Sequence, residues 1–322
     1  MSEPSTNSDP ATKTLGIDFG GTSVKFGVCQ NGEIIGRADP IPTARFAGPE
    51  ALIAEIVTKV EELREQFPEI SALGAGVPGL VDFDAGYIHE VTNVKGWVHV
   101  PLRSILEDRT GLKTVVDNDA NAMTYAEWKF GAARGMETVV ALTLGTGIGG
   151  GLIIDGKLHR GSSFTAGEIG QMSVNYSGRH GNYGNAGAIE KYVGNRDIAS
   201  HAVECYEKAG IKRTAEECEP RAIAEAAEAG DPVARQVWAD VAAWLGTALA
   251  NVAWLLNPSA IVIGGGVAKA GELLFKPLES RLKDMLSSVV WQNLEVIPAH
   301  FGNDAGIIGS ATLAADMIRS TD

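Results

Sequence analysis

Cysteine is scarce in this sequence, and the few cysteines form no motif. Only three occur in 322 residues, Cys29, Cys205 and Cys218, and no two of them have the CxxC spacing. An odd, scattered set does not make a disulfide framework, so a reducing cytoplasm is the expected location.

Basic residues are also in deficit. The chain has 27 Lys and Arg residues against 40 Asp and Glu residues, which gives a formal net charge of −13. Binding of DNA or RNA through phosphates requires clustered Lys and Arg side chains, so no nucleic-acid partner is expected. A nucleotide is still compatible with this charge, because a small anion needs only local donors.

Long apolar runs are missing as well. The longest, residues 241–256, has 16 residues and contains Thr247 and Asn251. This is short for a membrane span, so we expect a buried helix with Trp244 and Trp254 in the core, and no membrane partner. Residues 1–13 are polar, lack the apolar segment of a signal peptide, and are expected to form a loose tail.

Two stretches of the chain repeat one pattern. "TLGIDFGGTSVKFGVCQNGEIIGR" begins at Thr14, and "VALTLGTGIGGGLIIDGKLHRG" begins at Val140. Each contains an apolar run, a Gly/Thr-rich turn, a second apolar run, and an Asn-Gly or Asp-Gly pair before a third extended segment. Such pairs are strong hairpin signals, so each stretch predicts three antiparallel strands. The repeat predicts two related domains.

Helical periodicity occupies much of the remaining chain. Residues 48–67 place Leu52, Ile56, Val60 and Leu63 on one face. Further helices are expected after residue 118, in 221–256 with a break at 230–232, after residue 266, and at the C-terminus. Together with the hairpins they predict an α/β fold with mixed sheets.

Two matches to the dinucleotide pattern GxGxxG are misleading. They begin at Gly74 and Gly145, but the pattern indicates a dinucleotide site only between a strand and a helix. Pro78 and later glycines prevent a helix after the first match, and a hairpin follows the second. No GxxxxGK[ST] motif occurs, so a P-loop is excluded as well.

The glycine turns are instead suited to hold a polyphosphate. Backbone N–H groups in tight turns cradle anions, and glycine has no Cβ to keep a phosphate away. Asp18, at the end of the first strand, is expected to reach Mg²⁺ through water. Three turns predict nucleotide binding, the last of them receiving the adenosine: Gly20-Gly21-Thr22, Gly145-Thr146-Gly147 and Gly264-Gly265-Gly266.

These segments resemble the ROK family of sugar kinases and sugar-responsive repressors. The matching pieces, spread over about residues 14–318, are "GIDFGGTSVKFGV", "GAGVPGLVD", "NVKGWVHVPL", "VVDNDANA", "LGTGIGGGLIIDGKLHRG", "GEIG", "IVIGGGVA" and "AGIIGSATLA". The resemblance implies the actin/hexokinase-like (ribonuclease H-like) fold, duplicated into two domains with a cleft between them. We expect a small domain of residues 14–117, completed by a C-terminal helix at about 305–322, and a large domain of residues 118–304.

The same resemblance implies roles for the polar residues. "VVDNDANA" puts Asp119 where the family has its general base and Asn118 where it has a sugar contact. From the residues alone, Asp119 is equally well the N-cap of a helix. Glu168 and Glu190 match the family's two sugar-binding glutamates. Two further contacts with the sugar are expected from the backbone of Gly79 and from Asn93.

One motif of the family has lost its metal ligands. Most members have a histidine after "GEIG" and three cysteines in the next loop, which together bind a structural zinc ion. Here Gln171 stands at the histidine position, and Gly181, Tyr183 and Ala188 stand at the cysteine positions. No zinc is therefore expected. Gln171 is expected to take over the histidine's contact with the sugar, and Tyr183 to fill the vacated space.

The resemblance implies ATP-dependent phosphorylation of a hexose, most simply of glucose at its 6-hydroxyl. It also implies that Mg²⁺ is required and that the protein is a homodimer. Family repressors carry a helix-turn-helix domain before the first phosphate hairpin, and only about 13 residues precede it here. The remaining alternatives are a kinase for fructose, mannose or an N-acetylhexosamine, polyphosphate as phosphoryl donor, and a non-catalytic sugar-binding regulatory protein.

Overall fold

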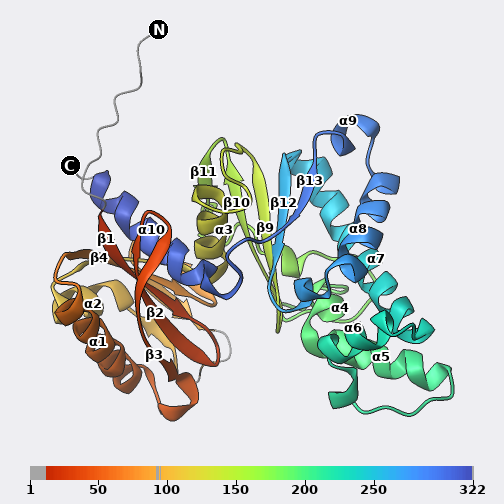
Figure 1. Ribbon diagram of the computed structural model, residues 1–322, viewed down its shortest axis with the longest axis horizontal. Coiled ribbons are helices and arrows are strands. Elements are labelled where there is room, and N and C mark those ends of the chain that lie inside the picture. Colours follow the sequence, from red (N-terminus) through yellow and green to blue (C-terminus); the bar gives the residue numbers. More distant parts are fainter. Residues whose placement is uncertain (1–11, 92–93, 95, 321–322) are drawn as a thin grey trace, which may run out of the picture. The chain divides into compact units, whose positions relative to one another are not determined.

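The computed structural model describes residues 12–91, 94 and 96–320 (Figure 1). The described chain divides into two compact units. Unit 1 takes in the chain up to Ala126 and again from Asp304 onward, and unit 2 is Glu127–Asn303. The division lies inside helix α3 (Asp119–Lys129), whereas the expected boundary after residue 117 lies near the end of the strand before this helix.

Unit 1 is built on a five-stranded sheet with the order β3-β2-β1-β4-β8. The first three strands are antiparallel, and β1, β4 and β8 are parallel. A small antiparallel sheet, β5-β6-β7, stands beside them. The strands are β1 (Lys13–Phe19), β2 (Ser23–Gln30), β3 (Glu33–Pro42), β4 (Ile70–Val77), β5 (Leu80–Asp82), β6 (Tyr87–Glu90), β7 (Val98–Val100) and β8 (Lys113–Asn118), and the helices besides α3 are η1 (Thr43–Arg45), α1 (Pro49–Gln66), α2 (Leu102–Thr110) and α10 (Ala305–Arg319).

Unit 2 contains the second five-stranded sheet, in the order β11-β10-β9-β12-β13. Its strands are β9 (Val139–Leu144), β10 (Ile148–Ile154), β11 (Lys157–His159), β12 (Ala260–Gly264) and β13 (Glu295–Pro298). Its helices are η2 (Ile169–Gln171), α4 (Glu190–Val193), α5 (Asn195–Lys208), η3 (Glu216–Cys218), α6 (Pro220–Glu228), α7 (Pro232–Leu256), η4 (Val267–Ala270), α8 (Glu272–Met285) and α9 (Ser288–Trp291), and η5 (Gly302–Asp304) spans the division.

The predicted repeat is present as two sheets of the same topology. In each, three antiparallel strands are followed by two parallel ones. Both expected hairpin pairs have positive φ, at 52° and 81° for Asn31 and Gly32 and at 52° and 67° for Asp155 and Gly156. Left-handed values at both positions define the type I′ turn that joins twisted antiparallel strands.

Helix α10 lies directly on the strands of unit 1 (Figure 1). A Cβ placed on Gly16 of β1 would collide with the backbone of Ile307, and one placed on Gly74 of β4 would collide with the backbone of Ser310. The glycine pattern that begins at Gly74 therefore allows close packing of a helix on a strand, and it is not a dinucleotide turn.

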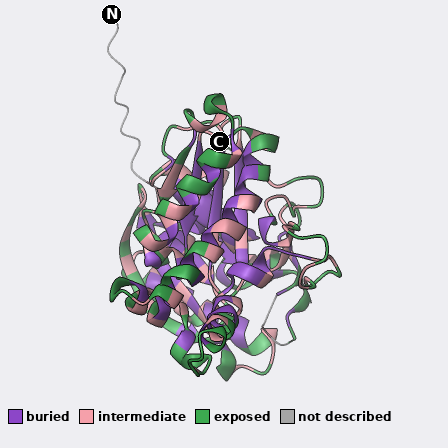
Figure 2. Cartoon of the chain, turned by 90° about the vertical axis from the view of Figure 1, so that its right-hand side faces the viewer, coloured by how far each residue is buried: buried purple, intermediate pink, exposed green. Residues whose placement is uncertain are grey.

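Apolar side chains fill one core in each unit, and exposed residues gather on the outer helix faces (Figure 2). The predicted face of α1 is buried at all four positions. Helix α7 is long and apolar enough to cross a membrane, but half of its most apolar window is buried within the protein. Trp244 packs partly buried against the core, whereas Trp254 is 56% exposed, so its expected burial was wrong.

Candidate active site

The first predicted phosphate turn joins β1 to β2 in unit 1. The N–H of Gly20 donates to the carbonyl oxygen of Ser23 (2.9 Å), and the hydroxyl of Thr43 donates to the carbonyl oxygen of Gly21 (2.8 Å). A Cβ placed on Gly21 would meet no atom within 4 Å, so the backbone of this turn is open on one side. That opening is the space that a phosphate group needs.

Asp18 lies at the end of β1, immediately before this turn. Its carboxylate oxygen Oδ2 pairs with Nζ of Lys25 at 2.9 Å, and only 17% of its side chain is exposed. A Cβ on Gly306 would lie 2.7 Å from the Asp18 carboxyl carbon, so the start of α10 also packs on it. A carboxylate fixed in this way is suited to bind a hydrated Mg²⁺ through water.

The second site segment of unit 1 is the junction between β8 and α3. Asn118 caps the helix, because its Oδ1 accepts from the N–H groups of Ala120 (2.8 Å) and Asn121 (3.2 Å). Asp119 is the first residue of the helix, where its Oδ1 accepts from the Ala120 N–H at 2.9 Å. Asp119 is partly exposed and lies in the first turn of the helix.

Gly79 is joined to this junction by a hydrogen bond. It has φ of 102°, and its carbonyl oxygen accepts from Nδ2 of Asn118 at 3.2 Å. The buried carboxylate of Asp117 accepts from the Asn118 N–H (2.8 Å) and from Nδ2 of Asn121 (2.9 Å). Asn118 is thus a rigid structural residue as well as a predicted sugar contact. Asn93, the other predicted contact of this unit, lies outside the described residues.

In unit 2 the second phosphate turn joins β9 to β10. The N–H of Gly145 donates to the Gly147 carbonyl (2.9 Å), and the N–H of Asn195, at the start of α5, donates to the Gly145 carbonyl (2.8 Å). A Cβ on Gly145 would meet no atom within 4 Å, whereas one on Gly147 would lie 3.2 Å from Oε2 of Glu190. The turn therefore has an open side, and it also adjoins Glu190, which is predicted to bind the sugar.

The "GEIG" segment lies against the glycine-rich strand β10. A Cβ on Gly150 would collide with the carbonyl oxygen of Gly167, and one on Gly170 would collide with the backbone of Ile148. Because Gly150, Gly167 and Gly170 have no Cβ, the loop rests directly on the strand backbone. This packing fixes the position of Glu168 between the two glycines.

Glu168 and Glu190 interact electrostatically. Burial of the carboxyl group raises the pKa of Glu168, and the negative charge of Glu190 raises this pKa further. Glu190 is 8% exposed at the start of α4, while Glu168 keeps access to solvent. Two neighbouring carboxylates of this kind can accept hydrogen bonds from a ligand with several hydroxyl groups, such as a sugar.

The raised pKa predicts a gain in stability when Glu168 is replaced by Gln. The folded protein holds the Glu168 proton more tightly than the unfolded chain does, so the ionised side chain costs stability at neutral pH. That cost disappears as the pH falls toward the ordinary value of 4.5. Ligand-free Glu168→Gln should therefore melt at a higher temperature than the wild type at neutral pH, and the difference should vanish in acid. Glu228→Gln, at the exposed end of α6, is the control and should show no such trend.

The loop that lacks the zinc ligands is held by asparagine side chains. Nδ2 of Asn185 donates to the backbone oxygen of Gln171 at 2.6 Å. A Cβ on Gly181 would collide with Oδ1 of Asn185 and would lie 2.7 Å from the Ala188 Cβ, so the amide occupies the space of the missing side chain. Tyr183 is 70% exposed and does not fill this space, contrary to expectation.

A buried carbonyl oxygen at Gln171 has no partner. Its Oε1 is shielded from solvent and accepts no hydrogen bond from the protein. An unpaired buried acceptor of this kind is costly, and a ligand hydroxyl would satisfy it. The contact of the Gln171 amide with the sugar stays a prediction.

Asn182 is a site residue that sequence reasoning missed. Its Nδ2 donates to Oε1 of Glu190 (2.8 Å), and its Oδ1 accepts from Nζ of Lys191 (2.8 Å). The Asn182 side chain therefore bridges the Glu190 carboxylate and the Lys191 ammonium group, which lies 3.9 Å from Oε1 of Glu190. No pattern in the sequence points to Asn182, because the contact depends on the path of the loop.

A cavity of about 560 Å³ adjoins the third glycine turn. Gly265, with φ of 88°, packs against the backbone of Leu144, and Gly266 faces open space at the cavity wall. The helix expected after this turn is present: it starts with the short helix η4 and continues as α8 after Gly271. The other lining residues come from α5, from η3 and from the start of α6: Asn195, Arg196, Ala199, Ser200, Ala215, Glu216, Glu219, Pro220 and Arg221.

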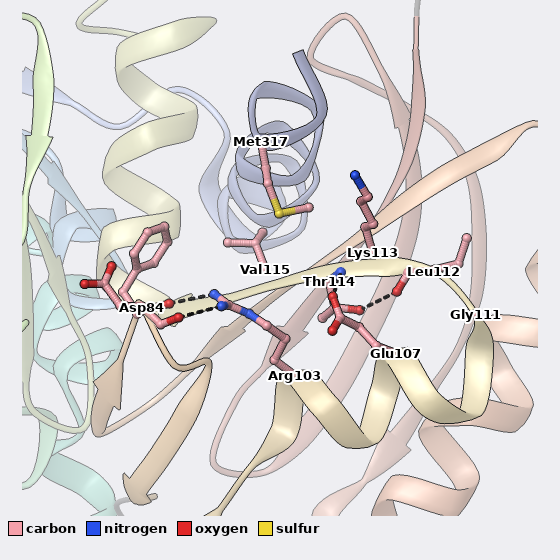
Figure 3. A pocket seen from close by; sticks show the side chains of 10 residues that line it. Asp84, Arg103, Glu107, Gly111, Leu112, Lys113, Thr114, Val115 and Met317 are labelled. Atoms are coloured by element: carbon pink, nitrogen blue, oxygen red, sulfur yellow. Dashed lines mark hydrogen bonds between the residues drawn. The ribbon is translucent and has the colours of Figure 1, made fainter. Parts of the chain in front are cut away.

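Unit 1 has a cavity of the same size that contains none of the predicted site residues (Figure 3). Arg103 crosses it, donating from Nη1 to the carbonyl oxygen of Asp84 (2.7 Å) and from Nη2 to that of Phe83 (2.6 Å). The guanidinium group thereby ties α2 to the turn between β5 and β6.

A family model for the ROK family matches residues 14–317. The chain belongs to the ROK family. The glucokinase of Streptomyces coelicolor is 36% identical over 313 residues, which cover 94% of this chain and 98% of that protein. The ROK relationship therefore spans both units and every predicted site segment.

Solved structures of ROK proteins have the same fold. That of a ROK family glucokinase from Streptomyces griseus in complex with glucose and AMPPNP has a TM-score of 0.80 and 34% identity, covering 94% of this chain and 99% of the other. That of the ROK hexokinase from Thermus thermophilus has a TM-score of 0.84 and 30% identity, with coverages of 96% and 99%. The predicted duplicated α/β fold class is confirmed.

Proposed function

We propose that this ROK protein transfers the γ-phosphoryl group of ATP to a hexose, with the 6-hydroxyl of glucose as the preferred acceptor. The observation that carries the proposal is the full-length similarity to glucokinases, one of them solved with glucose and an ATP analogue. The intact residue set of both units supports it. Phosphoryl transfer needs an in-line hydroxyl, a base and groups that stabilise charge, and each has a candidate here.

In unit 1, Asp119 accepts the proton of the attacking hydroxyl. Its place at a strand end and a helix start holds the carboxylate still while keeping it partly accessible. Asn118 and the Gly79 backbone, joined by their hydrogen bond, position this base and contact the sugar. A general base contributes about 10²–10⁴-fold in rate.

In unit 2, the carboxylates of Glu168 and Glu190 bind hexose hydroxyls. Their mutual repulsion is relieved when each accepts hydrogen bonds from the ligand. Oε1 of Gln171 accepts from a further hydroxyl, which removes the cost of its missing partner. A sugar that presents its hydroxyls differently leaves that acceptor unpaired, so Gln171 discriminates between hexoses.

The glycine turns of both units fit a nucleotide. Gly21 and Gly145 leave room where a phosphate approaches the backbone, and the cavity beside Gly266 accommodates an adenosine. Asp18, already paired with Lys25, would hold Mg²⁺ through its water ligands. Bound Mg²⁺ would neutralise part of the negative charge on the γ-phosphoryl group.

An ADP-release assay over a panel of hexoses tests the proposal. Glucose, mannose, fructose and N-acetylglucosamine are compared with ATP as donor, and glucose is repeated with polyphosphate. The expected result is the highest kcat/KM with glucose and ATP. Absence of turnover with every sugar and both donors would overturn the proposal in favour of a sugar-binding regulatory protein. Gel filtration checks the homodimer that the family relationship leads us to expect, and cell fractionation checks the expected cytoplasmic location.

Asn182→Ala should weaken sugar binding without disabling the chemical step. The variant loses the hydrogen bond that orients the Glu190 carboxylate, which contributes about 1.5–3 kcal/mol to the folded loop, so KM for glucose should rise. Because Asp119 is untouched, kcat should change little. Steady-state kinetics with glucose measure both values, and thermal melting checks that the loop is intact. Tyr183→Ala, one residue along the same loop, should leave KM near the wild-type value; equal effects of the two variants would contradict the role of Asn182.

A further inference from the structure

Three side chains with different metal-binding atoms converge between α5 and α7 of unit 2. His201 and Cys205 lie one helical turn apart on α5, and Asp240 comes from α7. Nε2 of His201 is 2.8 Å from Oδ2 of Asp240 and 3.5 Å from Sγ of Cys205. All three ligand atoms lie within 4.8 Å of one another.

We propose that His201, Cys205 and Asp240 bind a zinc ion. Imidazole nitrogen, thiolate sulfur and carboxylate oxygen are the three common zinc ligands, at about 2.0–2.3 Å from the ion. Ligand atoms of a tetrahedral site with such bonds lie about 3.3–3.8 Å apart, and the 3.5 Å between Cys205 and His201 already matches this spacing. The contact between His201 and Asp240 opens by about half an ångström when metal bonds replace the hydrogen bond.

The charges of the three residues suit a divalent ion. A thiolate at Cys205 and a carboxylate at Asp240 together neutralise the +2 charge, while His201 binds as the neutral imidazole. About 11% of the His201 side chain and 31% of the Asp240 side chain are exposed. The ion therefore has a path from solvent, and water completes its coordination, as in zinc sites with three protein ligands.

Neighbouring side chains fix two of the three ligands. Nε2 of Gln236 donates to Oδ1 of Asp240 at 2.8 Å, leaving Oδ2 directed at His201. The His201 ring packs edge to face on Trp244, with ring centroids 4.7 Å apart. Such outer partners orient metal ligands, and their loss commonly costs 10–100-fold in metal affinity.

This site is separate from the zinc loop of the family. None of its three residues lies in the segment from Gln171 to Glu190, where we expect no zinc. It is also separate from the proposed catalytic residues, so its test does not depend on kinase activity. Zinc that is lost on mutation of Cys205 belongs to this site, whereas zinc that persists belongs elsewhere.

Titration of the metal-free full-length protein with Co²⁺ tests the proposal, because cobalt reports sulfur ligation through a near-ultraviolet charge-transfer band and tetrahedral geometry through visible absorption. The expected result is one equivalent of Co²⁺, displaced by Zn²⁺, with both signals. Cys205→Ser should lose the charge-transfer band, and His201→Ala should lose binding. Gln236→Ala should bind about tenfold more weakly. The matched control is Cys218→Ala, which removes a fully buried cysteine of the same unit.

A second measurement guards against misfolded variants. A ligand that binds only the folded state raises its melting temperature, so Zn²⁺ should stabilise the wild type and Cys218→Ala but not folded Cys205→Ser. The proposal is overturned if wild-type protein binds no Co²⁺ and gains no stability from Zn²⁺. It is overturned equally if binding and stabilisation persist unchanged in Cys205→Ser and His201→Ala.

Discussion

Replacing Asp119 with Asn should lower kcat by about 10²–10⁴-fold and leave glucose binding largely intact. The amide keeps the shape of the side chain, and its oxygen still accepts from the Ala120 N–H as the carboxylate does. What it loses is the ability to take the proton of the sugar hydroxyl. A steady-state assay of ADP release gives kcat, and calorimetric titration with glucose gives the binding constant.

Asp82→Asn is the matched control for this experiment. Asp82 belongs to the same unit, and its Oδ1 likewise accepts a backbone N–H, that of Ala85, at 2.9 Å. The same chemical change at this exposed turn should leave kcat near the wild-type value. If Asp119→Asn also retains wild-type turnover, Asp119 is not the base and the proposed mechanism fails.

Replacing Gly74 with Ala should destabilise unit 1 by about 3 kcal/mol, the upper end of ordinary overpacking penalties. The new methyl group would collide with the carbonyl of Ser310, which is helix backbone and cannot rotate away as a side chain does. Helix α10 would have to move off β4. Thermal unfolding followed by circular dichroism should show a melting temperature lower by roughly 10 °C.

Gly48→Ala separates this clash from a general effect of adding a methyl group. Gly48 precedes α1 with an extended backbone, and a Cβ placed on it would meet no atom within 4 Å. Its melting temperature should stay close to that of the wild type. If Gly74→Ala also melts close to the wild-type temperature, the packing of α10 on β4 does not require a glycine at this position.

The parts of the fold encoded in short segments could be predicted from the sequence. Asn31-Gly32 and Asp155-Gly156 specify their hairpins locally, because both residues must adopt positive φ. The exact spacing of Leu52, Ile56, Val60 and Leu63 likewise identified the buried face of α1. The ROK resemblance then supplied the roles of Asp119, Glu168 and Glu190, which these local patterns do not contain.

The features that escaped prediction depend on residues brought together by the fold. Gly74 matched a nucleotide motif, but its neighbour is Ser310, far along the chain. The link from Asn182 to Glu190 requires the actual course of a glycine-rich loop. Trp254 continued the apolar pattern of α7, yet it lies near the end of that helix, where its indole N–H donates to Met285 and its face remains exposed.

Asparagine amides hold the loop beside Glu190, where most family members have thiolates, so a different kind of chemical damage affects this loop. Oxidants and chelators, which attack a cysteine–zinc loop, have no target in Asn182 or Asn185. Slow deamidation takes their place as the hazard, because asparagine is a thermolabile residue. An aspartate at 185 would set a carboxylate against the Gln171 carbonyl, and one at 182 would repel Glu190. Deamidation at Asn182 or Asn185 would therefore loosen this loop without any change in metal content.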